Sequence, residues 1–226
     1  MNTRPLPTIC LSLLLCAPAL AGQRPTGKGS VDEDAKWTVY TPPGMTKKKR
    51  PVLVCFDPAA NSKRMLETWG PVADELKWFL LVSKTSKNGG DMGAVARSLS
   101  KDFKALKKKH AFDAKRVAAT GYSGGGMTSH YLAMVLPKEI RAVIPNTGMI
   151  HPQFRNPGSY PKRKIVAFLA SPTDRRYGEM KKDKALLESL KWKVKWVEFK
   201  GGHVIATHEA CLEAANFVEA SWRKKK

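Results

Sequence analysis

Short apolar runs alternate with longer stretches of helical periodicity along most of the chain. Residues 51–56 form a continuous apolar run, which is typical of a strand buried on both faces of a sheet. Apolar residues recur at helical spacing through residues 93–109, and lysines gather at the end of this stretch, where they suit a helix C-terminus. The same reasoning predicts further strands at residues 36–40, 78–82, 117–120, 142–144, 165–170 and 194–199, and further helices at 61–69, 72–76, 127–136, 182–190 and 209–222.

This alternation of strands and helices predicts an α/β fold with a mostly parallel sheet covered by helices on both faces. The chain has 226 residues, of which 42% are hydrophobic and 26% charged, as is usual for a globular protein. The sequence contains no internal repeat or evident interdomain linker, so we expect a single domain over residues 36–226. Residues 22–30 are rich in glycine, proline and lysine, and residues 22–35 are expected to form a loose segment.

The first 21 residues have the pattern of a secretory signal peptide. One positive charge, Arg4, precedes an apolar stretch at residues 9–20, and small residues stand at Ala19 and Ala21. The apolar stretch is too short to cross a bilayer. An N-terminal core element is one alternative, and a lipoprotein site at Cys16 is another. We expect cleavage after Ala21 and a secreted or periplasmic protein.

Cleavage at that point leaves two cysteines, Cys55 in a predicted strand and Cys211 in the last predicted helix. Export would permit a disulfide between them. We favour two buried free thiols, and the sequence leaves the pairing open.

The chain is strongly basic, with 40 lysines and arginines against 19 acidic residues and a net charge of +21. Such a charge attracts acidic polymers through long-range electrostatics. However, the basic residues are scattered and are not interleaved with aromatic residues in any nucleic-acid-binding motif. A solvated basic surface is therefore favoured over a specific polyanion site.

The sharpest chemical motif is a serine in a glycine-rich turn. A predicted strand at residues 117–120 runs into Gly121-Tyr-Ser-Gly-Gly, and a predicted helix follows. A nucleophilic serine needs such a tight strand-to-helix turn, and small residues at Gly121 and Gly125 let the turn close around Ser123. A phosphate-binding glycine loop is the alternative, although the lysine of that motif is absent.

In an α/β fold that carries the serine on such a turn, its partners follow in the chain order acid and then histidine, on loops after later strands. Asp174 follows the predicted strand at residues 165–170, although it could instead cap a helix or pair with a neighbouring arginine. His203 follows the last predicted strand across two glycines, and His208 is the fallback. The sequence thus predicts a triad of Ser123, Asp174 and His203.

An oxyanion hole requires backbone N–H groups near the serine. Gly124, directly after the nucleophile, should supply the first. The second should come from the loop at residues 57–61, where Pro58 has no N–H to give. Ala59 is the preferred donor and Ala60 the second choice.

The residues around the serine resemble those of secreted esterases related to polyhydroxybutyrate depolymerases, a family that includes feruloyl and acetylxylan esterases. The matching positions lie in residues 112–127 and are Asp113, Arg116, Val117, Gly121, Ser123, Gly125, Gly126 and Met127. The resemblance implies an α/β-hydrolase fold. The chain departs from the family at the oxyanion loop, where Asp57-Pro58 replaces His-Gly, and at Gly124, where the family often has asparagine.

These observations predict an exported serine hydrolase that acts on a carboxylic ester, either carbohydrate-linked or small, through an acyl-enzyme. The ester could be carried on a polymer. No cofactor or metal is expected, because the histidines lack a ligand spacing such as H-E-x-x-H. Two alternatives stay open: a serine peptidase of the same fold, and a non-catalytic basic binding protein on a hydrolase scaffold.

Overall fold

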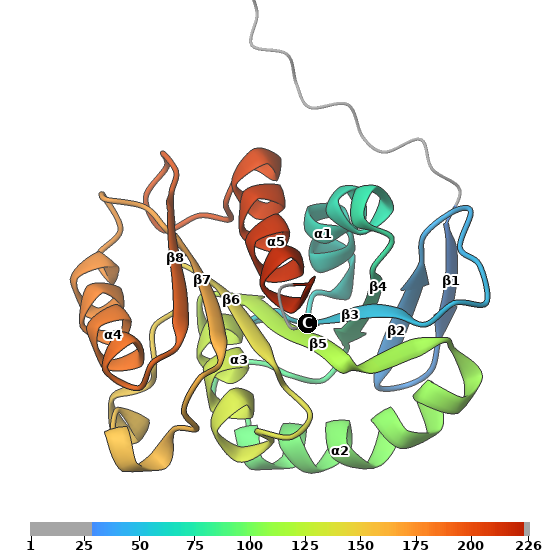
Figure 1. Cartoon of the computed structure of the whole chain (residues 1–226), viewed down its shortest axis with the longest axis horizontal. Coiled ribbons are helices and arrows are strands. Elements are labelled where there is room, and N and C mark those ends of the chain that lie inside the picture. The colour runs from blue at the N-terminus through green and yellow to red at the C-terminus, as the bar shows by residue number, and fades with distance from the viewer. Residues whose placement is uncertain (1–28, 224–226) are drawn as a thin grey trace, which may run out of the picture.

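A sheet of eight strands lies between two layers of helices in the computed structural model, which describes residues 29–223 (Figure 1). The strand order is β1-β2-β4-β3-β5-β6-β7-β8. β1 and β2 pair antiparallel with their neighbours, and all the other pairs are parallel. The strands are β1 (Ser30–Glu33), β2 (Trp37–Thr41), β3 (Arg50–Phe56), β4 (Phe79–Ser83), β5 (Phe112–Tyr122), β6 (Ala142–Asn146), β7 (Ile165–Ala170) and β8 (Lys193–Glu198).

Helices cover both faces of the sheet. Two lie on one face, α1 (Ser62–Leu76) and α5 (His208–Arg223), and three lie on the other, α2 (Met92–Lys109), α3 (Gly124–Val135) and α4 (Tyr177–Ser189) (Figure 1). Two short 3₁₀ turns, Pro152–Phe154 and Pro157–Ser159, lie between β6 and β7. This is the predicted α/β architecture, with a mostly parallel sheet between helical layers.

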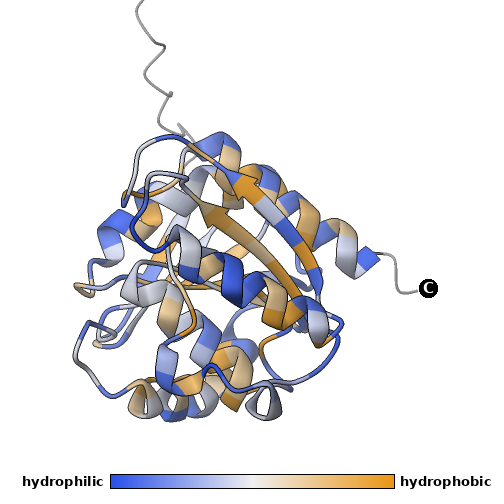
Figure 2. Ribbon diagram, turned by 90° about the vertical axis from the view of Figure 1, so that its left-hand side faces the viewer, coloured by the Kyte–Doolittle hydropathy of each residue, from blue (hydrophilic) through white to orange (hydrophobic). Residues whose placement is uncertain are grey.

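The alternation of side chains along β3 shows how the two layers are held together. Val52, Val54 and Phe56 pack with the side of α2 and α3, whereas Leu53 and Cys55 pack with the side of α1 and α5. Successive side chains of a strand point to opposite faces, so an unbroken apolar run serves both cores. Figure 2 shows the hydrophobic strands in the middle, between helices whose outer residues are mostly hydrophilic.

The sequence predicted two helices where the structure has one. α1 continues through Pro71, with Asn61 as its N-cap, which accepts a hydrogen bond from the backbone N–H of Arg64. Proline normally interrupts a helix. Here Trp69 and Val72, on either side of the proline, are both buried in the core, and this packing holds the helix together.

The segment at residues 22–35 is not loose where the structure describes it. Ser30–Glu33 forms β1 and pairs antiparallel with β2. Lys109 and His110, at the end of α2, bind the carboxylate of Asp32 and fasten the edge strand from the side. Residues 22–28 and the expected signal peptide with its cleavage site at Ala21 lie outside the described residues.

Cys55 and Cys211 are both buried and free, as predicted. Burial raises the pKa of the Cys211 thiol to about 12, so the thiol is protonated at neutral pH. Within residues 29–223, no helix is long and apolar enough to span a membrane.

Candidate active site

Ser123 lies on a strained turn between the end of β5 and the start of α3. Its φ of 55° and ψ of −114° are unusual for a residue with a side chain. Its N–H donates to the carbonyl of Asn146 on β6 at 2.9 Å, so the neighbouring strand fixes the turn. The residue is only 6% exposed. This is the strand–turn–helix geometry that presents a nucleophilic hydroxyl above the sheet.

The glycines around the serine are required because the backbones approach too closely for a side chain. A Cβ at Gly125 would lie 2.1 Å from the carbonyl oxygen of Phe56, the last residue of β3. A Cβ at Gly121 would lie 2.4 Å from the carbonyl carbon of Gly125. Both distances are far below van der Waals contact. The predicted reason for small residues at these two positions therefore holds in the structure.

The structure brings the three predicted triad side chains into one hydrogen-bonded chain. His203 Nε2 lies 2.9 Å from Ser123 Oγ, and His203 Nδ1 lies 2.9 Å from Asp174 Oδ2. The three residues follow β5, β7 and β8, whose carboxyl ends share one edge of the sheet. The side chain of Asp174 is fully buried, whereas that of His203 is 26% exposed.

This arrangement suits proton transfer from the serine. The buried carboxylate of Asp174 accepts the Nδ1–H of His203, which selects the tautomer whose Nε2 carries a lone pair. That lone pair faces Ser123 Oγ and can accept its proton. Chemically, the site can activate a hydroxyl nucleophile.

Two further contacts hold the histidine loop in place. The hydroxyl of Tyr122 donates to the carbonyl of His203 at 2.7 Å. The N–H of Gly202, at a φ of 74°, donates to the hydroxyl of Ser171, which lies between β7 and Asp174. The loops that carry the acid and the base are thus joined to each other and to the strand that carries the serine. No pattern in the sequence indicates this role for Tyr122.

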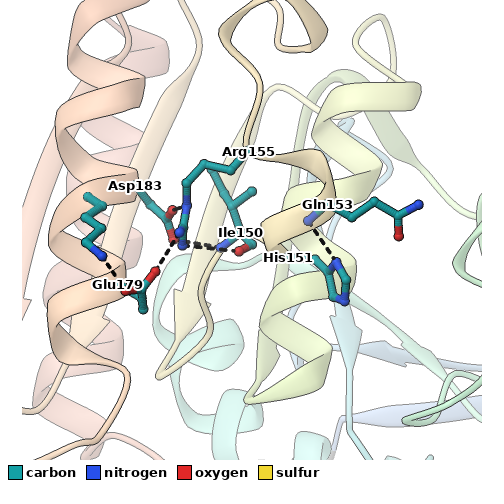
Figure 3. Close-up of polar contacts among 7 residues, drawn as sticks. Ile150, His151, Gln153, Arg155, Glu179 and Asp183 are labelled. Carbon is teal, nitrogen blue, oxygen red and sulfur yellow. Dashed lines mark hydrogen bonds and ion pairs between the residues drawn. The ribbon is translucent and has the colours of Figure 1, made fainter.

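Within the described part of the chain, none of the other histidines that follow Ser123 forms a hydrogen bond with its hydroxyl. His208 Nε2 bonds Glu75 of α1 at 2.9 Å, so the fallback base is engaged elsewhere. His130 is completely buried on α3, and burial lowers its pKa to about 3. His151 lies in the β6–β7 connection, where its Nδ1 accepts the N–H of Gln153 (Figure 3).

The expected second oxyanion donor is already bonded within its own loop. The N–H of Ala59 donates to Asp57 Oδ1 at 2.7 Å, and the N–H of Ala60 points to the Asp57 carbonyl at 3.2 Å. The expectation that Ala59, or Ala60 in its place, offers a free N–H is therefore not met in this structure. The physical reason lies in Asp57, whose buried carboxylate accepts the N–H of Ala59 and whose backbone carbonyl accepts that of Ala60.

Arg64 completes the environment of Asp57. Its Nε and Nη2 each lie 2.7 Å from a carboxylate oxygen of Asp57, a two-pronged ion pair. Burial by itself raises the pKa of Asp57, but the hydrogen bonds from Arg64, Ala59 and Asn61 outweigh it and lower the pKa below its usual value. The carboxylate stays charged and keeps the loop in this form.

The other predicted oxyanion donor, Gly124, is the first residue of α3, so its N–H has no carbonyl partner within the helix. A Cβ at this position would lie 1.8 Å from Oδ1 of Asn88. The carboxamide of Asn88 thus occupies the space that a side chain at position 124 would need. The backbone N–H of Asn88 donates to the carbonyl of Pro58 at 2.8 Å. Asn88 lies on a separate loop after β4, so no local sequence pattern connects it with Gly124.

A second residue missed in the sequence as part of the site is Arg176. Its guanidinium Nη1 lies 3.1 Å from Ser123 Oγ. Asp174 was considered as a partner for a neighbouring arginine, and it does contact Arg176, but through the backbone N–H at 2.9 Å. The guanidinium is left directed at the nucleophile.

An ion-pair network around the buried Asp183 lies between the β6–β7 connection and α4 (Figure 3). Arg155, in the β6–β7 connection, binds Asp183 and Glu179 of α4. The N–H of Ile150 donates to Asp183 Oδ2 at 2.7 Å. Burial raises the pKa of Asp183 to about 6. The network joins this connection to α4, the helix that begins three residues after Asp174.

No cluster of three or more histidine, cysteine, aspartate or glutamate residues with the arrangement of a metal site occurs in residues 29–223.

Comparison with known proteins identifies the fold. No protein-family model matches the sequence, and no curated protein is significantly similar to it. Among solved structures, the chain is similar to a carboxylesterase of Bacillus cereus, with a TM-score of 0.63 and 17% identity over 87% of this chain and 95% of the other. It is also similar to a thermostable esterase, with a TM-score of 0.59 and 16% identity over 86% of this chain and 62% of the other.

An acylaminoacyl peptidase is a further structural neighbour, with a TM-score of 0.58 and 14% identity over 88% of this chain and 41% of the other. The chain therefore spans less than two thirds of the length of the thermostable esterase and of this peptidase. At such identities the likeness concerns the fold alone. Together with the parallel sheet, the helical layers and the strained serine turn after β5, it shows that the chain has the α/β-hydrolase fold.

Proposed function

We propose that this protein is a serine hydrolase that cleaves carboxylic esters. The observation that carries the proposal is the hydrogen-bonded chain from Ser123 Oγ through His203 to Asp174, with the serine on a turn at positive φ. An esterase and a carboxylesterase among the structural neighbours support the ester class, and so does the resemblance around the serine.

The reaction would proceed through an acyl-enzyme. Ser123 Oγ attacks the carbonyl carbon while its proton moves to Nε2 of His203, and Asp174 stabilises the resulting imidazolium. The tetrahedral intermediate collapses, and the leaving alkoxide takes the proton from His203. Water then attacks the acyl group, passes a proton through His203, and releases the acid and the free serine.

Charge on the intermediate would be stabilised by the N–H of Gly124 and by a second donor. Ala59 can serve only by exchanging its bond to Asp57 for one to the oxyanion. The carboxamide of Asn88 lies against Gly124, with its Oδ1 nearest to a Cβ built there and its Nδ2 at 3.4 Å from that Cβ. The NH2 group of a side-chain amide is a suitable oxyanion donor. Asn88 is therefore the side-chain candidate for the second donor in this proposal.

The engaged N–H of Ala59 favours the alternative of a non-catalytic basic binding protein on the same scaffold, so the proposal includes a direct test for activity. The N-terminal signal-peptide pattern supports export, with the protein secreted or periplasmic. The full sequence has a net charge of +21, of which the predicted signal peptide holds only Arg4, and the remaining charge would draw the exported protein toward acidic polymers.

The test is hydrolysis of a panel of p-nitrophenyl esters beside a panel of chromogenic peptides. We expect ester cleavage that disappears in Ser123→Ala and His203→Gln. Ser100→Ala, which changes an exposed serine of α2, serves as the matched control and should keep full activity. Cleavage of peptides but not esters would identify a peptidase instead. If the folded wild type cleaves neither, or if Ser123→Ala stays active, the proposal is wrong.

A further inference from the structure

A positively charged side chain contacts the nucleophile. Arg176 Nη1 donates to Ser123 Oγ at 3.1 Å. The backbone N–H of Arg176 donates to Asp174 Oδ1 at 2.9 Å, so the position of this residue is tied to the triad acid. Its guanidinium is therefore held where a substrate meets Ser123.

This guanidinium has no carboxylate of residues 29–223 within ion-pair distance. Arg64 and Arg155, which are half-buried like Arg176, each bind a carboxylate of their own chain. Glu179, in the first turn of α4, is engaged by Arg155 instead. A guanidinium has five N–H donors, and most of those on Arg176 are unused. A half-buried arginine with unused donors is suited to bind an anion in a two-pronged manner.

Arg176 and the oxyanion donors approach the nucleophile from different sides. Asn88 lies against Gly124 and bonds Pro58 of the loop after β3, which pairs with β5 on one edge. Arg176 follows β7, which lies beyond β6 on the other edge of β5. The guanidinium thus faces a different part of the substrate from the carbonyl oxygen.

The electrostatic setting of Arg176 also favours a negative ligand. α4 begins at Tyr177, directly after Arg176, and the N-terminus of a helix carries partial positive charge. The whole chain adds a net charge of +21, which raises the local concentration of anions near the surface.

We propose that Arg176 binds a carboxylate on the substrate and makes the protein selective for anionic esters. On binding, the guanidinium exchanges its bond to Ser123 Oγ for the substrate carboxylate, and the serine proton stays directed to His203. The proposal deepens the function proposed above and rests on it for the ester, whereas the anion site itself rests on Arg176.

The test compares esters that differ only in one charge. On the acyl side, monomethyl glutarate is paired with the methyl ester of glutaric monoamide, and methanol release is measured. On the alcohol side, γ-acetoxybutyrate is paired with its primary amide, and acetate release is measured. We expect wild type to favour the carboxylate in at least one pair by roughly ten- to a hundredfold in kcat/KM, the usual range for a hydrogen bond to a charged group.

Substitutions at two adjacent arginines test whether the preference for the carboxylate substrate comes from Arg176. Arg176→Gln should bring the ratio of the two kcat/KM values close to one, and Arg176→Lys should retain part of it. Arg175→Gln removes the adjacent, exposed positive charge and should keep the wild-type ratio. A ratio near one in wild type, a ratio that survives Arg176→Gln, or an equal loss for both members of a pair would overturn the proposal.

Binding of glutarate by calorimetry separates this inference from the proposed function. Glutarate binding that is lost in Arg176→Gln and kept in Arg175→Gln, without hydrolysis of any ester, would support the anion site and contradict the hydrolase. Hydrolysis of neutral esters that depends on Ser123, without glutarate binding or charge preference, would contradict the anion site alone.

Discussion

The closed turn around Ser123 depends on the absence of a side chain at Gly125. In Gly125→Ala, the added Cβ would lie 2.1 Å from the carbonyl oxygen of Phe56, about 0.9 Å short of the shortest separation that real Cβ atoms show. The obstructing atom belongs to the backbone of β3, which pairs with β4 and β5 on both sides and cannot move cheaply. The turn itself therefore has to shift by a comparable distance.

We expect this shift to lower the free energy of unfolding by about 3 kcal/mol, the upper end of the range for overpacked sites. For a domain of this size, that lowers Tm by roughly 6–12 °C. A displacement of the nucleophile by about 1 Å should slow labelling by a fluorophosphonate probe on the order of a hundredfold. Thermal unfolding and the second-order rate of labelling measure the two effects.

Gly178→Ala is the matched control for this experiment. Gly178 lies in α4, has no positive φ, and has no atom within 4 Å of an added Cβ. The control should leave labelling unchanged and stabilise the protein by up to about 1 kcal/mol through helix propensity. If Gly125→Ala unfolds at the wild-type temperature and labels at the wild-type rate, the steric account of the turn is refuted.

Three further substitutions test the surroundings of the site. Tyr122→Phe removes the hydrogen bond to the His203 carbonyl, so it should lower the free energy of unfolding in urea by about 1 kcal/mol and slow fluorophosphonate labelling several-fold. An unchanged labelling rate would show that the tyrosine does not position His203. Arg64→Met leaves the buried Asp57 carboxylate without its ion pair and should cost about 2 kcal/mol, so equal unfolding midpoints would contradict that account. The pKa of His130 is about 3 in the folded protein and 6.5 as a free side chain. Between these pH values His130 is protonated in the unfolded chain and neutral in the folded one, so the free energy of unfolding falls as pH drops from 6.5 toward 3. His130→Leu should reduce the slope of this fall by up to about 1.4 kcal/mol per pH unit. Parallel curves of unfolding free energy against pH for wild type and variant would contradict this prediction.

The parts of the site that could be predicted are those that depend on neighbouring residues in the sequence or on the order of the elements along the chain. The strand, the two glycines and the helix around Ser123 are contiguous, so their sequence alone specifies the turn. Asp174 and His203 could be predicted because the fold fixes the order of the loops along the chain. In the structure His203 contacts Ser123, and Asp174 contacts His203.

The parts that were missed depend on contacts between distant segments or on the direction of a side chain. Asn88 reaches Gly124 from a loop after β4, a proximity that no local pattern records. The N–H of Ala59 is occupied because Arg64 fixes the Asp57 carboxylate beside it. Arg176 was noted as a neighbour of the acid, but whether its guanidinium would face solvent, the acid or the serine is decided by tertiary packing.

The fold shows the same division between local and distant information. The buried strands were predicted to within a few residues, except that β5 begins earlier than its apolar stretch, because apolar runs and turns define most of them locally. Other elements also differ from the prediction. α4 begins at Tyr177 rather than at residue 182, α1 continues through Pro71 since its flanking residues are buried, and β1 has polar residues that give no strand pattern. β1 exists because β2 offers it an edge to pair with and because the end of α2 binds Asp32.

The central claim is that Ser123 is an activated nucleophile, and mass spectrometry of the protein after reaction with a fluorophosphonate tests it most directly. The account predicts one covalent adduct, located on Ser123, in the wild type. It predicts no adduct in Ser123→Ala and a strongly slowed reaction in His203→Gln. A folded wild-type protein that forms no adduct, or an adduct on another residue, would contradict the account.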